Sequence, residues 1–390
     1  MVLIPRPALL LAVMILASGA SCLPVAVKNR ADVAIENYPV FVVVEREALL
    51  REGIDPSSMC VVDEAGNPLP FWVVPQTLNT SRVAMYVLIP YLMPREQMAF
   101  YITSGGCEQN PGDLFTFFDD FRDLDPRRWI IVSSPRVLNI TVKARGGLYI
   151  SGRFAATQQY LKVLSQPLTP PFTVDVLVTP LTGFDHDACL DVYILGTEVA
   201  HPSEARGAYI HAWGWGSPLN TSGTIAWYRV AGPSGTPEFL WDVTTWEEGG
   251  SSPVWEAGET FLFRISVCAE GVRYEVYRLS EEGLERILAN WNGLGIVNET
   301  VIGLGQECGG TYGFTQEALF HWIAVRPYVY PEPRVEVGVE KIVESPLEPI
   351  LEFLSKPANQ MLVAWGLVLL VFSLVFAAKI LKGGRGRPRR

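Results

Sequence analysis

The sequence predicts an all-β protein, in which a small sandwich is followed by a larger one and then by a single membrane-spanning helix. Three observations lead to this prediction. Strand signals are dense, turn formers interrupt almost every window (34 Gly and 29 Pro), and one long uncharged apolar segment lies near the C-terminus. Short β-branched or aromatic runs separated by turn residues are typical of sandwiches and barrels.

The first 20 residues have the order of a cleavable signal peptide. Arg6 supplies a positive start, residues 8–17 are apolar, and small residues surround Ala20. Such a run is too short to span a bilayer, which needs ~20 residues. We therefore expect cleavage after Ala20 and export of the rest. A lipid anchor on Cys22 is the alternative, although no Leu stands at the expected preceding place.

The exported part shows short strands between turn clusters. The turn clusters at 63–68 and 231–235 are rich in Gly, Pro, Asn and Asp. Only 46–52 and 281–288 have the composition of short helices. The clearest strands are expected at 40–44, 83–90, 173–178, 261–268 and 272–279.

The chain between the two ends is longer than one ordinary domain, which has roughly 100–150 residues. Glycine and proline interrupt the strand pattern between 104 and 113. We therefore expect a small extracellular domain at 24–108 and a larger one at 114–330. Pro331-Glu332-Pro333 opens a predicted stalk at 331–360.

Residues 361–381 form the predicted transmembrane helix. No charged side chain occurs between Met361 and Ala378, and the basic tail 382–390 follows at once. Positive charge stays on the cytoplasmic side, where it also attracts anionic lipid. The sequence therefore predicts a single-pass protein of the cell membrane, with its N-terminus outside and its C-terminus inside.

The exported part is strongly acidic. Seven of the 31 basic residues lie in the two end segments. The exported part therefore contains 24 basic residues and all 41 acidic ones, which gives it a formal charge of −17. This balance argues against a nucleic-acid partner. Four Asn-x-Ser/Thr sequences lie between the signal and the membrane segment, which makes them candidate glycosylation sites: Asn79, Asn139, Asn220 and Asn298.

The chain has six cysteines. In an exported protein they can form disulfides, and Cys60 and Cys107 share one segment, which makes them the candidate pair. Buried free thiols are the alternative. The chain contains no Cys-x-x-Cys, so a zinc or redox motif is not supported.

Residues 36–103 resemble the domain-of-unknown-function 2341 family, a small extracellular β-domain of archaeal surface and pilus-like proteins. The family has no settled activity, so this resemblance implies a fold and an order of domains. The matching residues are Tyr38-Pro39-Val40, 61–70, 84–90 and Phe100-Tyr101-Ile102.

The next stretch resembles a concanavalin A-like (laminin-G-like) jelly roll. Its opening is similar to residues 117–121 with Leu124-Asp125 and Trp129. Its closing segment is similar to 321–328 with Pro331-Glu332-Pro333. The resemblance implies a concanavalin-like jelly-roll β-sandwich at 114–330. Folds of this kind include lectins, adhesins and glycosidases, so the resemblance does not assign a function.

Catalytic motifs are not found. Jelly-roll glucanases usually carry Glu-x-Asp-x-x-Glu on one strand, and this chain lacks it. The nearest carboxylates, Glu238, Asp242 and Glu247, do not have the spacing of one strand face. There is no Gly-x-Ser-x-Gly and no His-Glu-x-x-His. We therefore expect no enzyme activity.

Asp185, Asp187 and Asp191 form a candidate Ca²⁺ site. Calcium takes oxygen ligands, and these carboxylates lie close together in the sequence. The alternative is an acidic turn before a strand at 190–195.

An aromatic stretch forms the candidate ligand-binding face. Its rings alternate with small or aliphatic residues, so a strand would place all of them on one side. Such a face can stack sugar rings. Trp241, Trp246 and Trp255 follow in a loop-rich region and could rim it, whereas ordinary sandwich core is the alternative. The alternating residues are Tyr209, His211, Trp213 and Trp215.

Taken together, these features predict a non-catalytic binding or structural ectodomain. Its expected ligand is a glycan, an envelope component or another surface protein. A subunit of a pilus-like or sheath-like assembly is the alternative, and an exported glycoside hydrolase is a third reading.

Overall fold

The computed structural model describes residues 22–342 except for 157–158, 183–187, 197–206, 215–221, 232–237, 242–253, 294 and 309–314. The described residues up to Lys341 belong to one unit. Strands make up most of them and helix is rare, which confirms the all-β prediction. Within these ranges no helix is long and apolar enough to cross a membrane. The predicted signal peptide, transmembrane helix and basic tail lie outside them.

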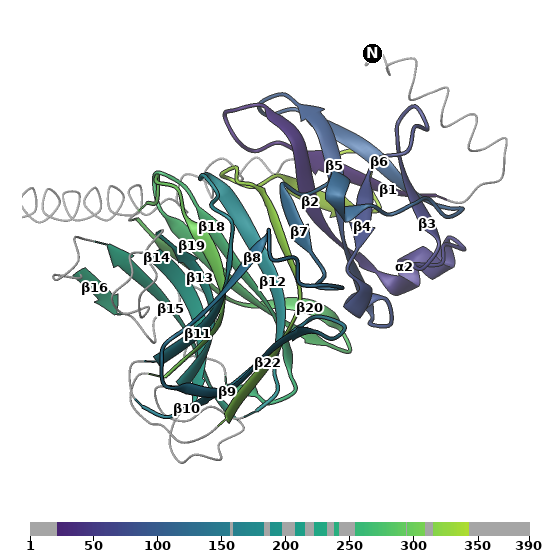
Figure 1. Ribbon diagram of the computed structural model, residues 1–390. Coiled ribbons are helices and arrows are strands. Elements are labelled where there is room, and N and C mark those ends of the chain that lie inside the picture. Colours follow the sequence, from purple (N-terminus) through teal and green to yellow (C-terminus); the bar gives the residue numbers. More distant parts are fainter. Residues whose placement is uncertain are drawn as a thin grey trace, which may run out of the picture. The chain divides into compact units, whose positions relative to one another are not determined.

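The first sandwich has two antiparallel sheets (Figure 1). One contains, in order, β23 (Arg334–Val337), β1 (Cys22–Lys28), β6 (Gln97–Ser104) and β3 (Met59–Asp63). The other contains β2 (Ile35–Glu45), β5 (Arg82–Leu92) and β4 (Phe71–Val73). Alternate residues of both sheets, such as Val42, Val87 and Phe100, form the core between them.

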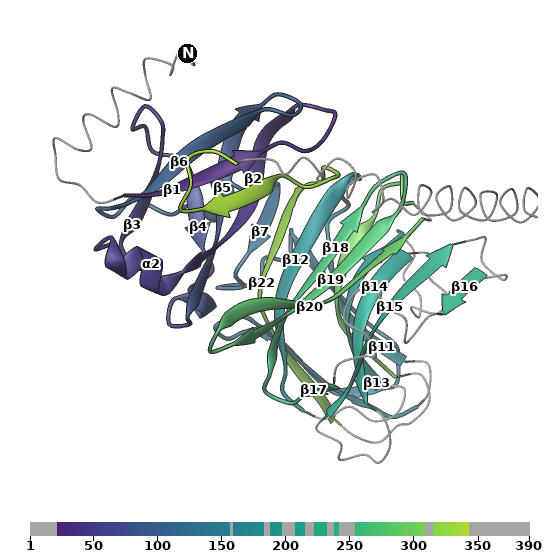
Figure 2. The ribbon, with the colours of Figure 1, turned by 180° about the vertical axis from the view of Figure 1, so that it is seen from behind.

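The strand β23 differs from the expected arrangement. The stalk was predicted to begin at Pro331, but Arg334–Val337 pair with β1 at the edge of the first sandwich (Figure 2). Val335 and Val337 pack partly against its core. The backbone groups at the edge of β1 gain partners in this way, which explains why the chain returns there after the larger domain.

One of the two predicted short helices is present. α2 spans Arg46–Arg51. The helix expected at 281–288 is wrong, because Gly283–Asn292 form the strand β20 instead. A bulge at Ile287 reverses the alternation, so Leu284 and Leu288 lie on opposite faces. The bulge therefore produces an apolar spacing that resembles a helix.

The second sandwich has two larger sheets, each of eight strands. We call the first the β22 sheet. It runs β20, β19 (Val272–Ser280), β18 (Thr260–Val267), β12 (Phe172–Pro180), β22 (Thr315–Pro327), β10 (Leu148–Phe154), β9 (Val137–Ala144), and β7 (Phe117–Asp119) also pairs with β22.

We call the second the β21 sheet. Both sheets contribute alternate apolar residues to one core, for example Val176 and Phe263 from the first and Ile210 and Leu304 from the second. The β21 sheet runs β16 (Glu238–Trp241), β15 (Ser222–Ala231), β14 (Gly207–Gly214), β13 (Ala188–Leu195), β21 (Val301–Cys308), β11 (Gln159–Ser165), β8 (Trp129–Ser133), and β17 (Val254–Glu256) also pairs with β15.

The other face of the β22 sheet packs against the first sandwich. Trp72 and Tyr86 of the first sandwich share one apolar cluster with Leu177, Leu262 and Trp322 of the second. The ring centroids of Trp72 and Trp322 are 5.1 Å apart. The two sandwiches are therefore joined by a buried contact as well as by the chain.

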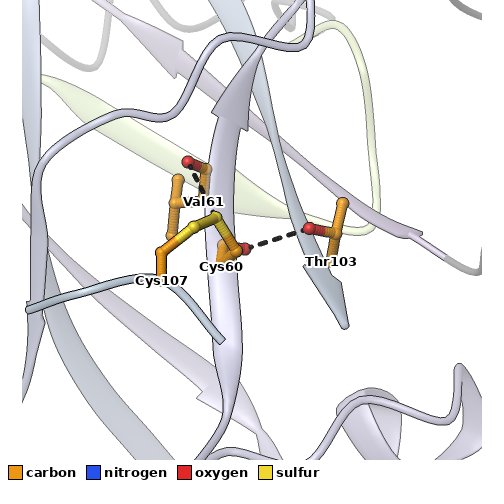
Figure 3. Close-up of a disulfide and its surroundings, with 4 residues drawn as sticks. All are labelled: Cys60, Val61, Thr103 and Cys107. Atoms are coloured by element: carbon orange, nitrogen blue, oxygen red, sulfur yellow. Dashed lines mark hydrogen bonds between the residues drawn. A yellow bond between two sulfur atoms is a disulfide. The ribbon is translucent and has the colours of Figure 1, made fainter. Parts of the chain in front are cut away.

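Cys60 and Cys107 form a disulfide, with their Cα atoms 4.9 Å apart (Figure 3). Cys60 lies on β3, which pairs with β6. The bond therefore ties the segment that leaves β6 back to the neighbouring strand. Cys22 and Cys268 are free thiols in the described part of the chain.

Candidate functional site

The aromatic strand exists as β14, and its alternation decides where its side chains lie. Ala208 and Ile210 belong to the core between the sheets. Tyr209 lies on the opposite face, is 3% exposed, and packs against Tyr193 with ring centroids 5.7 Å apart. Neither the open binding face nor the ordinary core describes Tyr209, which is buried on the outer face of the β21 sheet.

Of the other predicted ligand-binding residues, some lie on strands and some lie outside the described residues. His211 and Trp213 occupy the next alternate positions of β14. Trp241 is the last residue of β16 rather than part of a loop. Trp215 and Trp246 lie outside the described residues.

Strand register adds two aromatic residues that the sequence analysis missed. Tyr193 pairs with Tyr209, Tyr209 with Tyr228, and Tyr228 with Trp241. We call these four residues the aromatic row, which crosses β13, β14, β15 and β16. No single segment reveals it, because its members come together only through pairing between strands.

Trp255 does not rim this face. It lies on β17, has no exposed surface and belongs to the core between the sheets. Of the carboxylates considered for glycosidase activity, Glu238 begins β16, whereas Asp242 and Glu247 lie outside the described residues.

Asp191 of the predicted calcium site lies in the middle of β13, with no exposed surface. Its Oδ2 accepts a hydrogen bond of 2.6 Å from the hydroxyl of Tyr193. Asp185 and Asp187 lie outside the described residues. Across the ranges that the structure describes, no group of three His, Cys, Asp or Glu is arranged to hold a metal ion.

Asp191 belongs instead to a buried polar cluster that also contains Lys162 and Glu307. Lys162 pairs with Gly305, and Gly305 pairs with Asp191. Lys162, Gly305 and Asp191 therefore form one row across β11, β21 and β13. Lys162 and Asp191 have no exposed surface and Glu307 keeps 7%. The Nζ of Lys162 lies 4.7 Å from the ring centroid of Tyr160 and 4.9 Å from that of Tyr193.

Burial shifts both ends of this row toward their neutral forms. Burial lowers the pKa of Lys162 to about 8, although Glu307 and Asp191 act in the opposite direction. Burial likewise raises the pKa of Asp191 to about 8, against the hydrogen bond from Tyr193 and the charge of Lys162. The cause in each case is the cost of removing a charge from water.

The buried cluster does not have the form of a polysaccharide-cleaving site. Glycosidases need two carboxylates that flank a bound sugar. Asp191 is wholly enclosed and Glu307 nearly so. As it stands, the cluster is closed to a polymeric substrate.

Three of the four candidate glycosylation sites can be placed. Asn79, Asn139 and Asn298 are exposed. Asn220 lies outside the described residues.

Comparison with known proteins assigns no family. No family model and no curated protein matches the chain. Among solved structures, lectin II from Ulex europaeus is 12% identical and covers 54% of this chain and 97% of its own, with a TM-score of 0.35. The laminarinase catalytic domain from Thermotoga maritima is 14% identical, covering 55% and 98%, with a TM-score of 0.34.

A third similar structure comes from a study of endo-acting O-glycanases, which members of the human gut microbiota express to initiate mucin breakdown. It is 12% identical and covers 54% of this chain and 98% of its own, with a TM-score of 0.38. All three are remote likenesses over about half of this chain, and they include both a lectin and glycan-cleaving enzymes. They leave the protein without an assigned family or activity.

Proposed function

We propose that the protein is a non-catalytic, carbohydrate-binding protein of the cell surface. In this proposal the helix at 361–381 anchors it, the β-sandwiches lie outside, and the tail 382–390 lies inside. The ligand is a glycan or another envelope component. The acidic charge of the exported part and the exposed Asn79, Asn139 and Asn298 suit this location.

The aromatic row is the observation that carries the proposal. Aromatic faces stack on the apolar faces of sugar rings, and a tyrosine or tryptophan also offers a polar group. The buried contact between Tyr193 and Tyr209 fixes the inner half of the row. Tyr228 and Trp241 extend it to the strand β16 at the edge of the sheet. This outer half is the place where we expect a sugar to bind.

The closed cluster supports the non-catalytic part of the proposal. Asp191 lies two residues from Tyr193 on β13, and Lys162 and Glu307 lie on the neighbouring strands β11 and β21. Their burial separates them from a ligand at β15 and β16. Binding without cleavage is the activity that this arrangement favours.

Glycan binding can be tested with the full chain on an array of polysaccharides and envelope glycans. Trp241→Ala should weaken the best binding by about tenfold, which corresponds to ~1.4 kcal/mol, because a stacking surface is lost. Trp291→Ala is the matched control. Trp291 stacks on Tyr330 at 5.7 Å on the β22 sheet, so its loss should leave glycan binding unchanged.

A wild-type chain that binds no glycan on the array would contradict this function. If the wild type binds and Trp241→Ala binds equally well, the function stands and the site on the outer half of the aromatic row is wrong.

A surface assembly is the second candidate, and exposed apolar residues at two edge strands favour it. Ile130 and Ile131 on β8 are 51% and 47% exposed, and Leu138 and Ile140 on β9 are 50% and 41% exposed. Each strand is the last of its sheet. Exposed apolar edges promote contact between chains. A strictly monomeric full chain, purified from native membranes, would count against this candidate.

A further inference from the structure

Lys162 and Asp191 face each other across a position that has no side chain. Each pairs with Gly305 of the intervening strand β21. Neighbouring strands are ~4.8 Å apart, so the two Cα atoms are separated by about 10 Å, which an extended lysine and an aspartate can bridge together. A Cβ at Gly305 would collide with the carbonyl oxygen of Leu161, so glycine is required there and the path stays open.

The lysine side chain points toward this open position. Lys162 belongs to β11, yet its Nζ lies 4.9 Å from the ring centroid of Tyr193, a residue of β13. The hydroxyl of that same tyrosine donates to Asp191 Oδ2. The ring of Tyr193 leans over Gly303 of β21, so the amine and the carboxyl group lie on either side of the same tyrosine.

A third group lies beside both. Glu307 pairs with Tyr160, two residues before Lys162, and with Cys189, two residues before Asp191. Its position is thus diagonal to both ends of the row, within reach of a side-chain contact. Both Glu307 and Asp191 act electrostatically on the Lys162 amine.

Enclosure gives this trio a chemistry that an exposed ion pair lacks. In water an ammonium and a carboxylate do not condense, because the amine has no free lone pair and the carboxylate is a poor electrophile. Burial disfavours both charges, so at neutral pH the acid is mostly neutral and a share of the amine carries its free lone pair. The opposite shifts of the two pKa values, downward for Lys162 and upward for Asp191, agree with this state.

We propose that Lys162 and Asp191 form an intramolecular amide cross-link, with Glu307 as the proton carrier. The Nζ of Lys162 attacks Cγ of the protonated Asp191 and forms the C–N bond. The Glu307 carboxylate accepts a proton from the attacking nitrogen and returns one to the departing hydroxyl. The C–O bond breaks, one water leaves, and no oxidant or reductant is required.

Such a bond would join two strands that are not neighbours. It ties β11 to β13 across β21, and β12, which lies between them in the sequence, runs through the opposite sheet. The closed loop therefore includes strands of both sheets. An unfolded chain held in this loop has less conformational freedom, which stabilises the folded sandwich. This inference does not depend on glycan binding.

The sequence provides a direct test. Trypsin cleaves after Arg153, Lys162 and Arg206 and has no other site between them. After denaturation and reduction, an unlinked full chain yields the peptides 154–162 and 163–206. A cross-linked chain yields 154–206 as one species, because an acylated Lys162 is not cleaved, and its mass is one water lower than that of the linear 154–206 peptide.

Three variants assign the roles. Asp191→Ala should restore cleavage after Lys162, because no carboxyl group remains to acylate it. Glu307→Gln should leave most of the chain unlinked. Glu317→Gln is the matched control. This glutamate accepts a hydrogen bond of 2.6 Å from the hydroxyl of Tyr149 on the β22 sheet, away from the cluster, so the linked peptide should persist.

The wild-type digest decides the matter even if a variant does not fold. Complete release of 154–162 from wild type would overturn the cross-link, as would an uncleaved 154–206 peptide without the loss of water. Equal linkage in Glu307→Gln would overturn the role given to Glu307.

Discussion

Asp175 is the residue on which the contact between the two sandwiches is centred. It lies on β12, is fully buried, and contacts Arg264 Nε through Oδ1 at 2.5 Å and Arg326 Nε through Oδ2 at 3.4 Å. Burial raises the pKa of Asp175, but the two guanidinium groups outweigh this and hold it below its ordinary value. The carboxylate therefore stays charged inside the protein.

Two tyrosines of the first sandwich complete the network. Tyr86 donates to Asp175 Oδ2 at 2.8 Å, and Tyr38 accepts from Arg326 Nη1 at 2.7 Å. A buried ion pair is tolerated only when its remaining hydrogen-bonding groups are satisfied. The tyrosines supply such partners from across the contact.

The first prediction concerns Tyr86. Tyr86→Phe removes a buried hydrogen bond to a charged group, so the free energy of unfolding should fall by about 1.5–3 kcal/mol. Urea unfolding of the full chain measures this. Tyr91→Phe is the control, because Tyr91 is 48% exposed and its hydroxyl contacts only Met93 Sδ among the described residues, at 2.9 Å. An equal loss in both variants would contradict the assigned role of Tyr86.

At the scale of elements, the strands follow from local pattern, and their exceptions follow from pairing. β2, β5, β12, β18 and β19 contain the β-branched and aromatic runs seen in the sequence. β20 was mistaken for a helix because the bulge at Ile287 interrupts its period of two. β23 was assigned to a stalk because its partner, β1, lies at the other end of the described chain.

Gly305 lies where β21 passes close to the backbone of β11. Gly305→Ala should lower the free energy of unfolding by about 1–3 kcal/mol, because the added methyl group meets the backbone of Leu161. Gly293→Ala is the control, since nothing lies within 4 Å of a Cβ there, and it should stay within about 0.5 kcal/mol of wild type. Urea unfolding of both variants checks this. Equal stability of the two would show that β11 and β21 adjust without cost.

At the scale of the whole described molecule, the two sandwiches share a buried face. Aromatic residues surround the Asp175 network: Trp72 stacks on Tyr86 and meets Trp322 edge-on. β23, which follows the second sandwich in the sequence, completes a sheet of the first. The chain thus crosses from one sandwich to the other and back, so we expect the two to unfold together.

The last prediction tests this coupling. Asp175→Ala leaves Arg264 and Arg326 buried with one carboxylate fewer, which should cost about 3–5 kcal/mol. Hydrogen exchange in urea should show the same loss for the amides of β5 and of β12. Asp32→Ala is the control, because Asp32 pairs with Arg95 at the surface and should contribute no more than about 1 kcal/mol. Destabilisation of β12 alone would show that the sandwiches unfold independently.

Sequence alone was sufficient for the properties that depend on neighbours along the chain. The all-β class, most strands and the helix at Arg46–Arg51 follow from residue type and short periods. The acidic charge is likewise a simple sum over residues. Cys60 and Cys107 were the expected pair and are bonded in the structure, although they are 47 residues apart in the sequence.

Only the tertiary structure decided which distant residues share a site. Tyr193, Tyr209, Tyr228 and Trp241 form a row through register, and Lys162 and Asp191 both pair with Gly305 of a third strand. Antiparallel pairing fixes such contacts by the order of strands in a sheet. That order is set by how whole faces pack, so it is not encoded in any single segment.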